Sequence, residues 1–180
     1  WCRRATDYGH HLSIFRCGGI YGPGRSAMHT VFQKGMPAAA PAPTPNKPPV
    51  MDLTNRIHEH DLAAAVVASM LLEQDDALPA CEIYNLADDQ PESRRVVLEY
   101  ASDLLKSINV PVETRSSVVA AEGTSTSGRA VRRRTDHKRV SNQKMKDVLL
   151  PCLQYPTYKE GLDAILIDPT SPWQPTNAQT

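Results

Sequence analysis

The sequence predicts an α/β protein, because short apolar runs typical of buried strands alternate with segments that have helical periodicity. Residues 12–15 form an apolar run that ends in glycines, and residues 82–87 (EIYNLA) alternate before a turn. Residues 62–72 are apolar nearly all round, and residues 94–106 carry apolar side chains at helical spacing. This order is typical of a parallel sheet whose strands are joined by helices.

The first strand leads into the segment LSIFRCGGIYGPGR, residues 12–25. Its glycines allow the backbone to approach a ligand closely, and Pro23 stiffens the turn. Open α/β sheets bind ligands beyond the carboxyl ends of their strands. The loop is therefore the predicted functional edge.

Local signals predict where the helices begin and end. Ser26 and Gly35 bound a helix over residues 27–34, and Ser93 caps the helix over 94–106. Asp61 is the predicted N-cap of a helix that runs to about Glu73 and is too short to cross a bilayer.

The rest of the chain is predicted to contain a proline and alanine tract, a flexible loop and several short helices and strands. The proline and alanine tract 37–49 cannot continue a helix or a central strand, so it forms a semi-stiff linker or a surface insertion. The other predicted elements are a short strand at 110–114, a flexible loop at 115–134, a helix from 141 or 142 to 149, a last helix at 158–166 with a Thr157–Glu160 capping box, and a disordered tail at 168–180.

Three segments, in this order, resemble the NAD-dependent epimerase/dehydratase family of extended short-chain dehydrogenase/reductases: IFRCGGIYGPGR (14–25), NRIHEHDL (55–62) and IYNLAD (83–88). Residues 138–142 and 155–162 resemble an atypical branch of that family. In the family the first segment follows the catalytic tyrosine and lysine. The resemblance therefore implies that residues 1–167 are the C-terminal half of an NAD(P)-binding Rossmann-like domain, with part of the parallel sheet and a small α/β substrate-binding lobe.

The two signatures of the missing half are absent from this chain. No GxGxxG or GxxGxxG turn occurs. Tyr155 and Lys159 have the family's Tyr-x-x-x-Lys spacing, but Pro156 interrupts them and they follow the IYGPGR segment instead of preceding it. We therefore expect the chain by itself to be inactive, and to be marginally stable or prone to aggregation because a cut sheet exposes an unpaired edge.

The resemblance implies two groups of site residues. The rim of the pocket for NAD or NADP would comprise Gly19, Ile20, Tyr21 and Gly22. By resemblance the substrate cleft would include Arg56 and His58, and Arg25 is a further candidate because its planar guanidinium suits oxyanions.

Each of these assignments has a plainer alternative. Arg25 could meet a ligand phosphate or carboxylate, or could be a solvated arginine at a helix start. His58 could contact substrate or simply hydrogen-bond in the packing between strand and helix. Asn85 and Asp88 could border the cleft or form an Asx-type turn. His58 and His60 have a metal-like alternation, but no carboxylate or cysteine cluster completes a metal site.

The predicted function is the substrate-side part of an NAD(P)-dependent oxidoreductase, epimerase or dehydratase. Its substrate would be a polar small molecule, with nucleotide- and sugar-like compounds as candidates, and the full-length protein could be a homodimer. The alternative is a non-catalytic dinucleotide-sensing or scaffold protein of the same fold. A Tyr-x-x-x-Lys pair in the upstream half would separate the two hypotheses.

Charge and cysteine content bear on two further questions: whether the chain binds nucleic acid or membranes, and in which redox compartment it works. Lysine plus arginine and aspartate plus glutamate both total 20, so no net field draws the chain to nucleic acid or to an anionic membrane. The basic run 132–134, with Lys138 and Arg139, fits a solvated loop or a clamp on an anionic substrate better than nucleic-acid binding. The four scattered cysteines are expected to be reduced, as in the cytoplasm or an organelle stroma or matrix; an N-terminal targeting segment cannot be observed.

Overall fold

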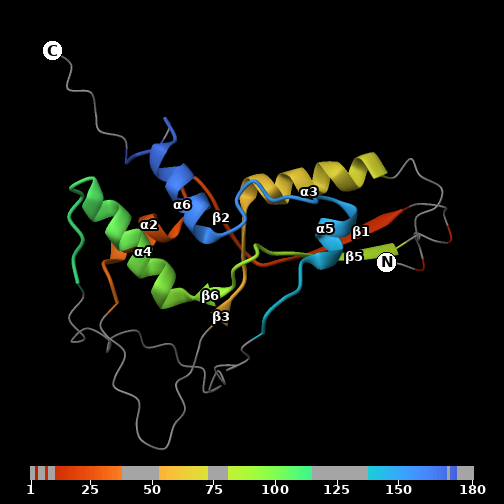
Figure 1. Ribbon diagram of the computed structural model, residues 1–180, viewed down its shortest axis with the longest axis horizontal. Helices are drawn as coiled ribbons and strands as arrows, with labels where there is room; N and C mark the ends of the chain where they lie inside the picture. The colour runs from red at the N-terminus through yellow and green to blue at the C-terminus, as the bar shows by residue number, and fades with distance from the viewer. Residues whose placement is uncertain are drawn as a thin grey trace, which may run out of the picture.

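The computed structural model describes Arg3, Asp7 and residues 11–37, 53–72, 81–114, 138–169 and 171–173 (Figure 1). Predictions for the proline tract beyond Pro37, the loop 115–134 and the end of the tail lie outside these residues. Within them, helices and short strands alternate along the chain as the α/β prediction requires.

A parallel strand pair forms one end of the molecule. Strand β1 (Leu12–Cys17) pairs with β5 (Cys81–Leu86), in a register that runs from Leu12 opposite Cys81 to Cys17 opposite Leu86. Helix α3 (Glu59–Leu72) lies between them in sequence and serves as the connection that parallel strands need. This confirms the predicted parallel sheet.

Two shorter ladders continue from this pair toward the other end. Strand β2 (Gly19–Tyr21) runs parallel to β4 (Arg56–His58). Strand β3 (Leu53–Thr54) runs antiparallel to β6 (Glu92–Ser93), an element that the sequence did not predict. A side chain at Gly18 would come within 2.9 Å of the Asn55 backbone, so glycine allows the two ladders to meet.

Helices α2 (Ala27–Lys34), α4 (Arg94–Ser107) and α6 (Tyr158–Ile167) form a separate lobe around one apolar core. The predicted bounds of α2 are confirmed, and Gly35 ends it with φ of 66°. The Thr157–Glu160 capping box also forms as predicted. The core comprises Tyr21, Met28, Val31, Val97, Leu98, Ala101, Leu105, Tyr158, Leu162, Ile165 and Trp173.

A second core joins the strands to α3 and to helix α5 (Gln143–Val148). It comprises Ile57, Ala65, Tyr84, Leu86, Met145, Leu149 and Leu153. The structure thus combines short parallel strand pairs with helices, as the α/β prediction requires, but the part formed by α2, α4 and α6 is helical where a small α/β lobe was predicted.

Asp61 does not cap its own helix, because α3 begins two residues earlier, at Glu59. Its side chain is 2% exposed and accepts hydrogen bonds from the backbone N–H groups of Gln154 (2.8 Å) and Tyr155 (3.0 Å). The carboxylate therefore holds a distant loop against α3, a non-local role that no local capping rule predicts.

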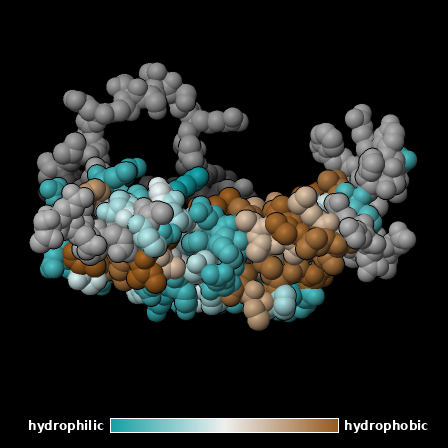
Figure 2. Space-filling model, turned by 90° about the horizontal axis from the view of Figure 1, so that it is seen from above, coloured by the Kyte–Doolittle hydropathy of each residue, from teal (hydrophilic) through white to brown (hydrophobic). Residues whose placement is uncertain are grey.

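Helix α3 is not buried all round. Val67, Met70 and Leu71 are 55%, 63% and 69% exposed. Figure 2 shows apolar side chains gathered on this face of the molecule. Among the described residues, nothing covers this face of the helix.

Three further expectations need correction. The predicted strand at 110–114 is reduced to an isolated bridge between Met36 and Thr114. Disorder was predicted from Asp168 onward, but Trp173 is packed against the helical lobe. It is 7% exposed, and its ring lies 5.0 Å from that of Phe32 between centroids. Cys81 is in a disulfide, whereas Cys17 and Cys152 are free and exposed.

In the part of the chain that the structure describes, no helix combines the length and apolar character needed to cross a membrane.

Candidate functional site

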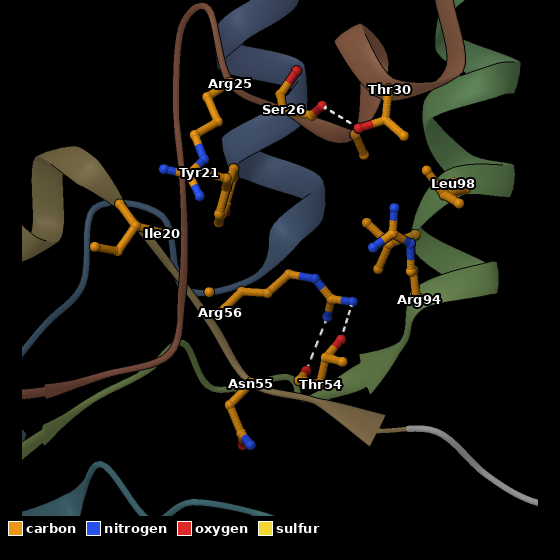
Figure 3. Close-up of a pocket in the computed structure, with 13 residues that line it drawn as sticks. Ile20, Tyr21, Arg25, Ser26, Thr30, Thr54, Asn55, Arg56, Arg94 and Leu98 are labelled. Atoms are coloured by element: carbon orange, nitrogen blue, oxygen red, sulfur yellow. Dashed lines mark hydrogen bonds between the residues drawn. The ribbon is translucent and has the colours of Figure 1, made fainter. Parts of the chain in front are cut away.

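A cavity of about 290 Å³ opens between the end of β2, the start of α2, the β3–β4 segment and the first turns of α4 (Figure 3). The parallel ladder of β2 and β4 forms its floor, and the helical lobe forms its far side. Its lining comprises Gly19, Ile20, Tyr21, Arg25, Ser26, Ala27, Thr30, Thr54, Asn55, Arg56, Arg94, Val97 and Leu98.

Three arginines, Arg25, Arg56 and Arg94, line this cavity, and no carboxylate does. They come from three distant parts of the chain: the loop after β2, strand β4 and the first residue of α4. Guanidinium groups match the geometry of phosphate and carboxylate oxygens. The cavity is therefore suited to an anionic ligand.

Arg56 is held in place by the β3–β6 ladder. Its Nη1 donates to the backbone oxygens of Thr54 and Glu92, each at 3.0 Å, and its Nη2 donates to Oγ1 of Thr54. Burial lowers the pKa of Arg56, while the Asp88 carboxylate opposes that shift. A fixed guanidinium loses little conformational entropy on binding a ligand.

Two hydroxyl groups stand on the opposite wall, at the start of α2. Ser26 Oγ lies 2.9 Å from His29 Nδ1, and Thr30 Oγ1 donates to the Ser26 backbone oxygen at 3.2 Å (Figure 3). Burial lowers the pKa of His29, so its imidazole is neutral near pH 7. The wall thus offers polar groups without negative charge.

Tyr21 closes the inner end of the cavity. Its hydroxyl donates to the Thr157 backbone oxygen at 3.4 Å, and the residue is 7% exposed. Burial raises the pKa of this phenol, and the carboxylates of Asp88 and Asp61 raise it further. Tyr21 therefore stays protonated at neutral pH and acts as a neutral wall.

The structure brings together Gly19, Ile20, Tyr21, Arg25 and Arg56 of the predicted site residues. It does not bring Gly22 or His58 to the cavity.

His58 is 5% exposed and takes part in packing. Its Nδ1 accepts a hydrogen bond from the His60 backbone N–H at 3.2 Å, and its ring lies 4.1 Å from that of Tyr155 and 5.1 Å from that of Tyr21. Burial lowers its pKa, although Asp61 and Glu59 oppose this. The geometry supports the packing interpretation of His58 over substrate contact.

Tyr155 and Lys159 do not share a helix, because α6 begins at Tyr158. The Tyr155 ring lies against that of His58 at a tilt of 43°, whereas the Lys159 Nζ lies 5.9 Å from the centre of the Tyr100 ring. No continuous helix therefore carries both side chains, and the accidental nature of this spacing stays a prediction.

Five lining residues with polar side chains were missed at the sequence level: Ser26, Thr30, Thr54, Asn55 and Arg94. For one of these residues, Arg94, the sequence does contain a feature that could have indicated a binding role. Arg94 is the first residue of α4, where a positive charge opposes the helix dipole. A cation in an electrostatically unfavourable place indicates a role other than stabilising its own helix.

Asp88 follows β5 closely and does not line the cavity. It is 3% exposed, and neither carboxylate oxygen has a hydrogen-bond partner among the described residues. Burial raises the pKa of Asp88 to about 7, although Arg56 and the backbone amide of Gln90 lower it. That amide has the position of an Asx-turn donor, but no hydrogen bond of ordinary geometry forms, so the turn does not explain this burial.

Two of the residues predicted for the rim of a dinucleotide pocket, Gly19 and Ile20, lie at this cavity. Ile20 is 39% exposed at the cavity edge, and Gly19 leaves the neighbouring backbone open. The chain contains no glycine-rich turn that could place a pyrophosphate at a helix N-terminus. No group of three metal-binding side chains occurs within the described ranges.

No family model and no curated protein matches the chain. Solved structures do. A protein of unknown function from Silicibacter pomeroyi is 28% identical with a TM-score of 0.59, and the match covers 90% of this chain and 50% of that one. A Methylobacillus flagellatus protein, provisionally named an NAD-dependent epimerase/dehydratase, is 25% identical with a TM-score of 0.54, covering 90% and 49%.

A third match shows the fold alone. UDP-glucuronic acid 4-epimerase from Bacillus cereus, solved with UDP-glucuronic acid and NAD, is 15% identical with a TM-score of 0.54, and the match covers 91% of this chain and 46% of that one. The chain thus spans about half the length of the structures it matches. It has the fold of a part of these Rossmann-like proteins, as the resemblance to their C-terminal half predicted.

Proposed function

We propose that this chain forms the substrate side of an NAD(P)-dependent oxidoreductase, epimerase or dehydratase, and that its arginine-lined cavity binds an anionic substrate such as a nucleotide sugar. The observation that carries the proposal is the convergence of Arg25, Arg56 and Arg94 on one cavity without a lining carboxylate. The guanidinium groups would bind and orient the phosphates of the substrate.

Similar structures support the general kind of reaction. The Bacillus cereus epimerase holds NAD beside a nucleotide sugar, and a further structure, RMD from Pseudomonas aeruginosa, holds NADPH. A dinucleotide in such a protein supplies hydride transfer. In this chain Gly19 and Ile20 would form only the rim of its pocket, and the residues that hold pyrophosphate and move the proton would come from another part of the protein.

The second hypothesis is a non-catalytic dinucleotide-sensing or scaffold protein, which would not need the catalytic tyrosine and lysine. The chain contains neither the glycine turn nor an accessible Tyr-x-x-x-Lys pair on one helix. A native protein whose other half also lacks the pair would favour this hypothesis.

We predict that Arg94→Ala weakens binding of UDP-glucose to the chain by roughly tenfold or more, because a charge-assisted hydrogen bond contributes about 1.5–3 kcal/mol. Calorimetric titration would measure this, with methyl glucoside as a ligand that lacks the phosphates. Arg95→Ala is the matched control, since Arg95 lies next in sequence but pairs with Glu99 at 2.7 Å on the surface. Equal affinities for the two variants would contradict the arginine site.

A further inference from the structure

A second cavity, of about 660 Å³, lies at the carboxyl ends of β1 and β5. Arg16 and Asn85, which line it, are opposite one another in the parallel register. Open parallel sheets bind ligands at this edge. The volume is within the range of small-molecule sites, roughly 300–1,000 Å³. Its lining comprises Arg16, Cys17, Gly18, Gly19, Asn55, Asn85, Lys138, Arg139, Val140 and Ser141.

All the charged side chains that line this cavity are basic. Arg16, Lys138 and Arg139 line it, and none of the lining residues is acidic. All three are exposed in the structure. Cations gathered in a concave surface create a stronger local potential than the same charges on a flat one.

The segment that carries Arg139 is fixed from both sides. Asn55 donates through Nδ2 to the Lys138 backbone oxygen at 2.8 Å and accepts through Oδ1 from the Val140 backbone N–H at 3.0 Å. The next residue is held as well, because Asn85 Nδ2 donates to the Ser141 backbone oxygen at 3.2 Å. Two carboxamides therefore hold the backbone on either side of Arg139, so the position of this residue at the cavity wall is set before any ligand arrives.

These two carboxamides also explain why a basic segment lies here. By sequence alone, the basic run at 132–134 with Lys138 and Arg139 fits either a solvated loop or an anion clamp. Lys138 and Arg139, the described part of that stretch, do not form an independent loop. Their segment is hydrogen-bonded to Asn55, between β3 and β4, and to Asn85 of β5.

We infer that this second cavity is a binding site for a small molecule that carries phosphate or carboxylate groups, with Arg16 and Arg139 as its principal charged contacts. It is separate from the arginine cavity of the proposed function, with which it shares only Gly19 and Asn55. The inference therefore does not depend on the identity of the substrate in the first cavity.

The free thiol of Cys17 provides a direct test, because it lines the cavity and is exposed. Alkylation of the 180-residue chain by uncharged iodoacetamide, resolved by peptide mass, would be followed with increasing inorganic pyrophosphate or citrate. Cys152 is also free and exposed and does not line the cavity, so it is the internal control. Sodium chloride at matched ionic strength controls for general screening.

We expect saturating pyrophosphate or citrate to slow alkylation of Cys17 at least threefold and to leave Cys152 unchanged. Arg139→Ala and Arg16→Ala should each raise the concentration for half-maximal protection about tenfold, with each variant compared with its own rate without anion. Arg25→Ala, in the first cavity, should leave protection intact. Protection by only one of the two probes would assign the site to phosphates or to carboxylates.

Three results would overturn the inference: a Cys17 rate that neither probe changes, protection that sodium chloride reproduces, or protection that survives both Arg16→Ala and Arg139→Ala. Loss of protection in Arg25→Ala would place the anion in the first cavity and would also count against a separate site. Circular dichroism spectra that match that of the wild type would show that the variants remain folded. Failure here leaves the Arg94→Ala prediction untouched, since Arg94 does not line the second cavity.

Discussion

Asp88→Asn is expected to make the chain more stable at pH 8, by about 4 kcal/mol, because burial raises the pKa of this carboxyl from 3.8 to about 7. The carboxyl is 3% exposed, and its oxygens have no hydrogen-bond partner in the described part of the chain. Ionising it without a hydrogen-bonded partner costs free energy that an uncharged amide of the same shape avoids.

The sign of the pH dependence follows from proton linkage. Between pH 3.8 and about 7 the folded state keeps the proton of Asp88 and the unfolded state does not, so stability falls as pH rises through this range. Asp88 therefore contributes its full stability only below pH 3.8 and has lost it above about pH 7. Three charged side chains act on it: Arg56 lowers its pKa, and Asp89 and Glu160 raise it.

Urea unfolding of wild type and Asp88→Asn at pH 5 and pH 8 measures this difference. Asp89→Asn is the matched control from the adjacent position. Burial raises the pKa of Asp89, but hydrogen bonds from Lys146 and Asn142 outweigh it and lower that pKa, so this substitution should destabilise the chain at pH 8. If Asp88→Asn were no more stable than wild type at pH 8, the carboxyl would have a partner that we have not identified.

Gly161→Ala is expected to destabilise the chain by about 2 kcal/mol or more, because α6 has no room for a side chain at this position. A Cβ there would come within 2.7 Å of Cε2 and 2.8 Å of Cζ of Tyr21, and closer still to its hydroxyl. Both residues are buried. The steric cost exceeds the gain of about 1 kcal/mol that alanine usually brings to a helix interior.

Tyr21→Phe should rescue part of that loss, since it removes the atom nearest to the new methyl group. Thermal unfolding of the two single variants and the double variant gives the coupling free energy between the positions. The expected coupling is favourable in the double variant. Additive effects would show that the Tyr21 hydroxyl is not the group that opposes the new methyl group.

The local elements were predictable because their signals are local. Ser26 and Gly35 bound α2, and the Thr157–Glu160 pair marks the start of α6. The apolar face of α4 follows from its own spacing. Such features depend on residues a few positions apart, so one sequence suffices to find them.

The site was predictable only in part, because it depends on contacts between distant residues. Arg56 has a fixed guanidinium only because β3 meets β6, and the sequence gives no signal for a ladder of two residues. The role of Asn55 likewise depends on residues more than eighty positions away. The resemblance supplied Gly19, Ile20, Tyr21 and Arg56, and guanidinium chemistry supplied Arg25, but Arg94 joins them only when the lobe is assembled.

The packing of Trp173 makes its fluorescence sensitive to the surroundings of α2. The indole lies 5.2 Å from the ring of His29 and 5.0 Å from that of Phe32, both on α2. His29 in turn contacts Ser26, which lines the first cavity. A fluorophore at the end of the chain is therefore linked through one imidazole to the ligand-facing wall, so its emission would report changes at that wall without any attached dye.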